Sequence, residues 1–126
     1  MRTILVAALV LVVAACSAPS TSDVPTPAAP TAEAIEVSVA DFMIDPSDLE
    51  VVGPTVTISV TNDGPTPHNL TVRDGDGAVV AGTDDLSVSD RETITAELEP
   101  GNYTIFCALA GHESLGMSGT LIVSAP

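Results

Sequence analysis

The sequence has no lysine and only three arginines, whereas aspartate and glutamate together number 17 and the formal net charge is -14. One of the arginines, Arg2, lies in a leader that we expect to be removed. A surface of this sign repels phosphate groups, which excludes nucleic acid as a partner. It also repels anionic lipid headgroups, so attachment to a membrane requires a covalent or an apolar anchor.

Aromatic side chains are scarce too, because the chain has two phenylalanines, one tyrosine and no tryptophan. Hydrophobic residues make up 45% of the chain, and alanine, valine and threonine are abundant. Packing of small and β-branched side chains favours strands. After removal of a leader, the 126 residues supply one domain of roughly 90 residues with a single small core. We therefore expect an all-β domain.

The first 15 residues have the pattern of a signal peptide. A short positive start is followed by Ile4–Ala15, an uninterrupted run of twelve apolar residues. A helix of that length covers well under the ~30 Å hydrocarbon core of a bilayer, so it is too short to remain as a membrane span. Residues 1–15 are therefore predicted to be cleaved.

Cys16 directly follows Ala14 and Ala15, and this junction resembles the bacterial lipobox, in which the cysteine is lipidated and becomes the mature N-terminus. The alternative is an ordinary signal peptide with an incidental cysteine near its cleavage site. The residues that follow are mainly Ser, Thr, Pro and Ala, which cannot bury enough apolar surface to fold. We predict a lipidated Cys16 with a linker over residues 16–34, and a folded domain over residues 35–126.

Apolar residues alternate with a period of two throughout residues 35–126, a pattern that is typical of half-buried strands. Turn signals such as Asp63-Gly64-Pro65 and Pro100-Gly101-Asn102 separate the alternating segments. The pattern predicts a Greek-key β-sandwich of about eight strands. The expected strands lie near residues 37–39, 49–52, 56–60, 70–72, 78–81, 94–98, 103–107 and 121–123.

The chain has only two histidines, His68 and His112, and both fall at the ends of expected strands. His112 shares a loop with Cys107 and Met117 in the spacing Cys-x4-His-x4-Met. A thiolate and two imidazoles with a weak thioether on the axis suit copper in both oxidation states, because soft sulfur favours Cu(I) and nitrogen tolerates Cu(II). Bound copper would also keep Cys107 as a thiolate, outside disulfide chemistry.

Each of these residues has an ordinary explanation when it is taken singly. Cys107 fits a small buried hydrophobe, His112 an exposed loop residue and Met117 a side chain that fills a gap in the core. The four together, with the flanking glycines and strands, favour a copper site over coincidence. Met43 belongs to no ligand pattern and is expected in the core.

From about Ile35 to Pro126 the sequence resembles the blue copper proteins, the cupredoxins of the plastocyanin and azurin kind. The pair His68-Asn69 matches the family's first ligand after a turn, and Tyr103–Gly119 matches its Tyr-x-x-x-Cys to Gly-Met-x-Gly loop. The loop departs from the azurin-like pattern at Ala110, where that pattern has proline, and its Cys-to-His step is longer than in plastocyanin.

The resemblance implies one type 1 copper ion, with His68, Cys107 and His112 as equatorial ligands and Met117 as the axial ligand. It also implies that Asn69 hydrogen-bonds the ligand loop and steadies the thiolate. The implied function is that of an extracytoplasmic, membrane-anchored carrier of single electrons. The alternative is a copper-binding or copper-delivery lipoprotein in which the metal is cargo.

Small apolar residues beside His112 predict a docking patch for a redox partner, although packing within the loop explains them equally well. The patch consists of Ala108, Leu109, Ala110 and Leu115. We expect a monomer whose partner is a cytochrome or a membrane oxidoreductase, steered by the acidic surface. We place it on the outer face of the cytoplasmic membrane or in the periplasm.

Enzyme activity is not expected. Multicopper oxidases need additional histidines, and a binuclear copper centre needs a second cysteine in the loop, whereas this loop has one. Asp74-Gly75-Asp76-Gly77 resembles the start of a calcium loop, but Ala78 occupies the third ligand position, so a hairpin turn is predicted instead.

Overall fold

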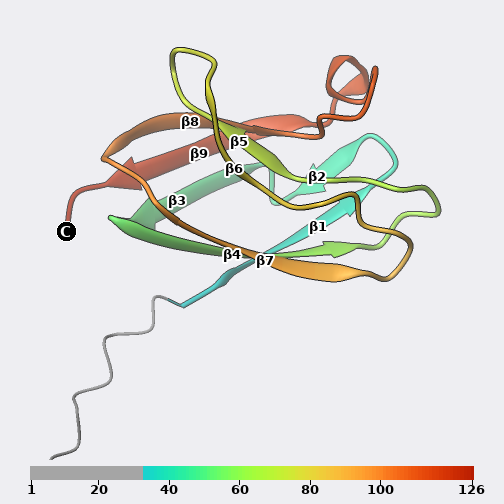
Figure 1. The fold of residues 1–126 in the computed structure, drawn as a ribbon, viewed down its shortest axis with the longest axis horizontal. Coiled ribbons are helices and arrows are strands. Elements are labelled where there is room, and N and C mark those ends of the chain that lie inside the picture. Colours follow the sequence, from blue (N-terminus) through green and yellow to red (C-terminus); the bar gives the residue numbers. More distant parts are fainter. Residues whose placement is uncertain (1–32) are drawn as a thin grey trace, which may run out of the picture.

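A computed structural model describes residues 33–126, which form two β-sheets packed face to face (Figure 1). The predicted signal peptide, Cys16 and the linker up to residue 32 lie outside the described residues. The described part contains nine strands and one 3-10 turn, namely β1 (Ile35–Ala40), β2 (Met43–Asp45), β3 (Asp48–Val52), β4 (Thr55–Asn62), β5 (Thr71–Arg73), β6 (Val79–Gly82), β7 (Arg91–Glu97), β8 (Gly101–Phe106), η1 (Glu113–Leu115) and β9 (Ser118–Ser124).

The strands connect as a β-sandwich of the Greek-key kind, as the sequence predicted. One sheet has the order β2-β1-β4-β7 and the other has the order β3-β9-β8-β5-β6. The pairs β1–β4 and β3–β9 are parallel, and the other neighbouring strands are antiparallel. Parallel neighbours cannot be joined by a tight turn, so the chain passes repeatedly from one sheet to the other.

Alternation along the strands gives each sheet one face that lies against the other sheet. In β9, for example, Leu121 and Val123 are buried, whereas Ile122 between them is exposed. The side chains of this shared core are mostly valine, leucine and isoleucine, in keeping with the small hydrophobic residues of the sequence. The buried cluster comprises Val37, Val39, Ile44, Leu49, Val56, Ile58, Val60, Leu70, Val72, Leu86, Ile94, Leu98, Ile105, Cys107, Met117, Leu121 and Val123.

The first hairpin differs from expectation. Strand β2, which the alternation pattern did not indicate, pairs with the end of β1 over three residues, with Met43 opposite Ala40. Because neighbouring side chains on a strand point to opposite faces, Ile44 turns into the core and Met43 turns outward. Met43 is 55% exposed, so the prediction that it lies in the core was wrong.

The two ends of the sandwich differ in what they carry (Figure 1). The loop that contains η1 and the turn between β1 and β2 lie at one end, where the rings of Phe42 and His112 have their centroids 5.6 Å apart. Strand β1 begins at the opposite end, and the C-terminus lies there too. The expected metal ligands are therefore remote from the point where the chain enters the domain.

Candidate metal centre

The loop with three of the expected ligands closes the β8–β9 hairpin. Pairing between these strands reaches Phe106 and Ser118, so Cys107 and Met117 are the next residue on each side. The Cys107 N–H donates a hydrogen bond to the Met117 carbonyl at 3.1 Å. Both side chains are fully buried, and the hairpin therefore places a thiol and a thioether at the end of the core.

His112 projects from a tight turn within the same loop. Gly111 and Gly116 adopt φ values of 83° and 114°, conformations that residues with a Cβ rarely adopt. The Met117 N–H donates to the His112 carbonyl at 3.2 Å, which closes the turn onto the start of β9. His112 Nδ1 consequently lies 3.6 Å from Cys107 Sγ.

The other histidine comes from the connection between β4 and β5. His68 is fully buried and forms an isolated bridge with Leu86 through backbone hydrogen bonds of 3.1 and 2.7 Å. Asn62, also fully buried, donates from its side-chain amide to the carbonyls of Thr66 and Leu86, both at 2.8 Å. Asn62 thereby shapes the turn that positions His68, a role that no sequence pattern indicated.

These two segments bring three donor atoms together. His68 Nδ1 lies 3.2 Å from His112 Nδ1, and His68, Cys107 and His112 each offer one donor atom that lies within 4.8 Å of the other two. Bond lengths to zinc indicate the donor separations that a first-row metal ion requires. Zinc binds imidazole nitrogen at about 2.0 Å and thiolate sulfur at about 2.3 Å, so neighbouring donors around it are separated by roughly 3.3–3.8 Å. The donor set fits a single metal ion, and the combination of one thiolate with two imidazoles fits copper.

Asn69 makes the type of contact that the resemblance implied. Its Oδ1 accepts a hydrogen bond from the Ala108 N–H at 2.7 Å, while its Nδ2 donates to Asp85 Oδ1 at 2.8 Å. Because Ala108 follows Cys107, the hydrogen bond ties the start of the ligand loop to the segment that contains His68.

Asp41 was not among the predicted site residues, yet its carboxylate contacts His68. Asp41 Oδ1 lies 2.9 Å from His68 Nε2 and accepts a hydrogen bond from Thr66 Oγ1 at 2.6 Å. The hydrogen bonds from Thr66 and then His68 hold the pKa of the Asp41 carboxyl below its ordinary value. Asp41 lies 27 positions before His68, a separation at which no local motif links the two residues.

The donors differ in their access to solvent. His68 and Cys107 are fully buried, whereas His112 is only partly buried. Of the predicted docking patch, Ala108, Ala110 and Leu115 are exposed, and Leu109 is partly buried against the core. The site therefore meets solvent on the side of His112.

Phe42 is a third residue, after Asn62 and Asp41, that no sequence pattern indicated. It is 47% exposed, and its ring meets the ring of His112 edge-on at an interplanar angle of 74°. Its φ of 60° is unusual for a residue with a bulky side chain. We use the term His112 face for the exposed apolar residues Phe42, Ala108, Ala110 and Leu115.

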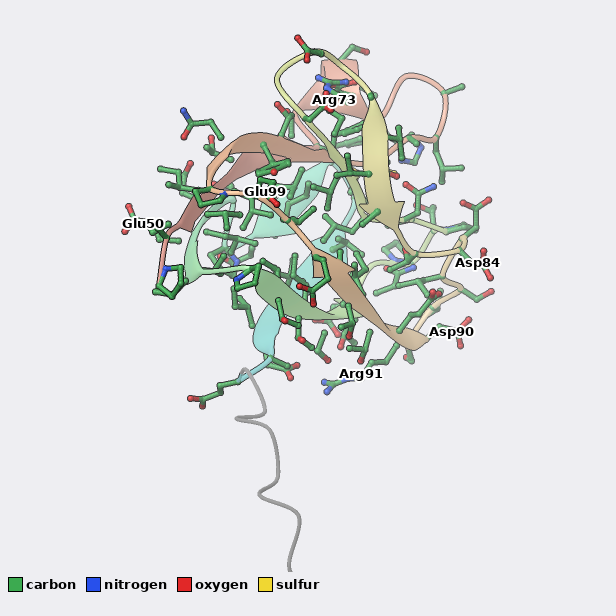
Figure 2. The ribbon with its side chains drawn as sticks, turned by 60° about the vertical axis from the view of Figure 1, so that its left-hand side comes forward. Glu50, Arg73, Asp84, Asp90, Arg91 and Glu99 are labelled. Atoms are coloured by element: carbon green, nitrogen blue, oxygen red, sulfur yellow. The ribbon has the colours of Figure 1, made fainter. Side chains whose placement is uncertain are left out.

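A charged contact holds the outer side of the ligand loop. Arg73, labelled in Figure 2, forms a two-point ion pair with Glu113, in which Nη1 lies 3.1 Å from Oε2. The guanidinium also lies 4.3 Å from the ring centroid of Phe106, the residue before Cys107. Partial exposure weakens such a pair, but its bidentate and stacked geometry orients Glu113 and the turn that follows His112.

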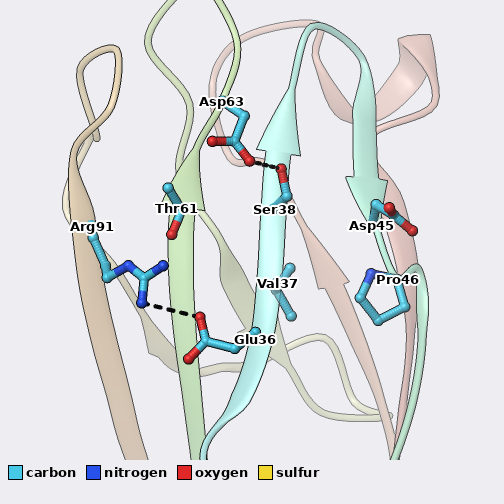
Figure 3. A pocket seen from close by; sticks show the side chains of 8 residues that line it. All are labelled: Glu36, Val37, Ser38, Asp45, Pro46, Thr61, Asp63 and Arg91. Carbon is cyan, nitrogen blue, oxygen red and sulfur yellow. Dashed lines mark hydrogen bonds and ion pairs between the residues drawn. The ribbon is translucent and has the colours of Figure 1, made fainter.

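A shallow groove of about 380 Å³ lies on the sheet that contains β1, and it is separate from the metal centre (Figure 3). Three of its charged groups have partners, because Arg91 pairs with Glu36 at 3.2 Å and Ser38 donates to Asp63 at 2.5 Å. None of its lining residues belongs to the donor cluster. They are Glu36, Val37, Ser38, Asp45, Pro46, Thr61, Asp63 and Arg91.

Comparison with known families agrees with this site. The model of the cupredoxin-like domain matches residues 4–123, so the chain belongs to the cupredoxin-like family, a family of copper electron-transfer proteins. The resemblance seen in the sequence is thus confirmed. The family's cofactor is one type 1 copper ion, in keeping with the cluster of His68, Cys107 and His112. No curated protein matches the chain.

Solved structures share the fold. Reduced auracyanin of the photosynthetic bacterium Roseiflexus castenholzii is 22% identical over 72% of this chain and 96% of its own, with a TM-score of 0.66. Auracyanin A, a blue copper protein of Chloroflexus aurantiacus, is 18% identical over 73% of this chain and 100% of its own, with a TM-score of 0.62. A purple cupredoxin of Nitrosopumilus maritimus is 27% identical over 71% and 99% of the two chains, with a TM-score of 0.51.

The contact between Asn69 and the ligand loop leads to a test by substitution. Asn69→Ala removes the acceptor of the Ala108 N–H, so we expect the free energy of unfolding of the metal-free domain to fall by about 1–2 kcal/mol. Hydrogen exchange at the Ala108 amide should become faster. Urea denaturation and amide exchange measured by NMR check the two effects.

Asn102→Ala is the control, because Asn102 is exposed on β8, and surface substitutions usually change the unfolding free energy by less than about 0.5 kcal/mol. If Asn69→Ala behaves like this control and exchange at Ala108 is unchanged, the assigned role of Asn69 is wrong.

Proposed function

We propose that this protein is a blue copper electron carrier in which His68, Cys107 and His112 are the equatorial ligands and Met117 is the axial ligand. The observation that carries the proposal is the convergence of one donor atom from each of His68, Cys107 and His112 within 4.8 Å. Copper supplies single-electron chemistry by cycling between Cu(I) and Cu(II). The chain's own residues hold the donors, exclude water and offer one edge to a partner.

The way the donors are held supports a carrier. Cys107 and Met117 continue a strand ladder, His68 is fixed by its bridge to Leu86, and Asn69 links the two segments. Donors fixed by backbone hydrogen bonds and a packed core move little when the charge of a bound metal changes. Small movements keep the barrier to electron transfer low.

Burial favours this role over copper delivery. His68, Cys107 and Met117 are fully buried, so handing the metal to an acceptor would require the loop to open and the core to be disturbed. His112 alone among these residues reaches the surface, and an electron can leave through its ring while the metal stays in place.

Titration of a soluble fragment that starts at Ser17 tests the copper site. One equivalent of Cu(II) should produce an intense visible thiolate-to-copper band that a mild reductant bleaches. The band should be missing in Cys107→Ser. A carrier should also retain the metal through repeated oxidation and reduction, whereas a delivery protein should release it to an acceptor.

Two methionine variants sharpen this test. Met117→Leu should keep the band and raise the reduction potential, because a weak axial thioether is lost while the volume is preserved. Met43→Leu is the matched control and should change neither, since Met43 is exposed on β2. A parent protein without the band and with weak metal retention contradicts the proposal.

We propose that the His112 face docks a redox protein that carries positive charge around an apolar centre. The face is apolar, with Phe42 and Leu115 exposed by 47% and 60%, and it belongs to a chain with a net charge of -14. Opposite charges bring partners together, and a small apolar contact permits rapid release. A basic cytochrome has this chemistry.

The bimolecular rate of electron transfer to a basic cytochrome measures this docking. It should fall steeply as salt rises from about 0.01 M to 1 M, because the Debye length then shrinks from roughly 30 Å to 3 Å. Leu115→Glu should slow the reaction at high salt, where the apolar contact dominates. Val52→Glu is the matched control, since Val52 is 64% exposed and lies in β3, outside the His112 face. A rate independent of salt would disprove the charge steering, and equal effects of the two variants would disprove the docking face.

We further propose that Cys16 is lipidated and tethers the domain outside the cytoplasm, with cleavage after residue 15. Within residues 33–126 no helix is long and apolar enough to cross a membrane. Strand β1 begins at the end opposite the His112 face (Figure 1), an arrangement that turns the site away from a membrane to which the linker is attached. A linker of about 18 residues spans roughly 25 Å when flexible and up to ~55 Å when extended.

Phase partitioning of the full-length chain after expression in a bacterial host checks the anchor. The parent should enter the detergent phase, and Cys16→Ser should move to the aqueous phase because the acyl chains are lost. Cys107→Ser, which removes the other cysteine, should partition like the parent. Partitioning of Cys16→Ser with detergent would contradict lipidation.

A further inference from the structure

We propose that Asp41 is a positioning residue of the metal centre, which keeps the proton of His68 on Nε2, directs the Nδ1 lone pair toward the other donors and favours the oxidised metal. The effect on the metal rests on the proposed function. The effect on the imidazole of His68 does not, because it is a property of the chain without metal.

The hydrogen bonds around His68 Nε2 support this role. Asp41 Oδ1 lies 2.9 Å from Nε2, and the Thr66 hydroxyl lies 3.2 Å from it. Thr66 donates its hydroxyl hydrogen to Asp41 Oδ1 at 2.6 Å, so neither neighbour offers a hydrogen to Nε2. An ionised carboxylate only accepts hydrogen bonds, and Nε2 must therefore be the donor.

The opposite side of the ring is thereby prepared for a metal. A neutral imidazole has one N–H, so a proton held on Nε2 leaves Nδ1 with a free lone pair. Nδ1 lies 3.2 Å from His112 Nδ1, inside the donor cluster. Without Asp41, the Thr66 hydroxyl would be free to donate its hydrogen to Nε2, and the ring could then carry its proton on Nδ1, where it would block coordination.

Asp41 reaches His68 because two turns approach each other closely. A Cβ on Gly64 would lie 2.9 Å from the Ala40 Cα and 3.0 Å from the Asp41 nitrogen, so glycine at this position permits the contact. The Asp63 N–H also donates to the Val39 carbonyl at 2.9 Å. The β1–β2 turn is thus packed against the turn that leads to His68.

The negative charge of Asp41 also favours metal binding at Nδ1 of His68. A carboxylate on the far nitrogen of a histidine ligand raises the basicity of the ligating nitrogen, which stabilises a dication more than a monocation. The Asp41 side chain is 40% exposed, whereas that of His68 is fully buried. Solvent screens part of this interaction but leaves the contact at Nε2 intact.

Three variants separate charge from orientation. Asp41→Asn removes the charge but keeps an oxygen acceptor, Asp41→Ala removes both, and Asp45→Asn is a matched control that removes an exposed carboxylate from the same hairpin. Nitrogen-15 NMR of the metal-free protein reports which ring nitrogen of His68 carries the proton. Voltammetry of the copper-loaded protein reports the reduction potential.

We expect Nε2–H in the parent, in Asp41→Asn and in Asp45→Asn, and a loss of this tautomer in Asp41→Ala. In Asp41→Asn the ratio of Cu(II) affinity to Cu(I) affinity should fall about ten-fold, which equals a rise in potential of about 59 mV for one electron. Asp45→Asn should cause a much smaller rise.

Retention of Nε2–H in Asp41→Ala would overturn the positioning role, and equal potentials for Asp41→Asn and Asp45→Asn would overturn the effect on the metal. If the parent itself binds no copper, the proposed function fails, and with it the effect on the metal. The tautomer of His68 in the metal-free protein then still decides whether Asp41 positions the ring.

Discussion

The metal centre depends on one constraint, which is that two segments distant in sequence must meet at the same end of the sandwich and stay there. The β8–β9 hairpin holds Cys107 and Met117 through its ladder, and the bridge between His68 and Leu86 holds the other segment. The hydrogen bond from Ala108 to Asn69 joins the two. The backbone makes most of these contacts, so folding itself brings the donor atoms together. Metal binding therefore does not have to order the two segments.

The same architecture divides the tasks of an electron carrier between the two ends of the molecule. At one end, His68 and Cys107 are fully buried, His112 is partly buried and Phe42 is exposed. This arrangement keeps water from the thiolate and gives a short path for electron transfer from the donors to the surface. Strand β1 begins at the other end, where the C-terminus also lies. Arg73 adds a cation beside the ligand loop of an acidic chain, and its ion pair with Glu113 neutralises it there.

Much of the fold and the donor set could be predicted from sequence, because both are encoded locally. Alternation marks each longer strand, and the spacing of Cys107, His112 and Met117 lies within one loop. Strand β2 has only three residues, too few for alternation to show, and the wrong assignment of Met43 to the core follows from that. Asp41, Phe42 and Asn62 were missed because their roles arise from contacts between turns, and these depend on strand register and on the close approach at Gly64.

The most direct test of a preformed centre is a comparison of crystal structures of the metal-free, Cu(I) and Cu(II) proteins. The distances from His112 Nδ1 to His68 Nδ1 and to Cys107 Sγ are 3.2 and 3.6 Å. In a preformed centre, the three donor atoms should keep their positions to within about 0.5 Å in all three states. A ligand loop that opens in the metal-free protein, or that rearranges between Cu(I) and Cu(II), would contradict it.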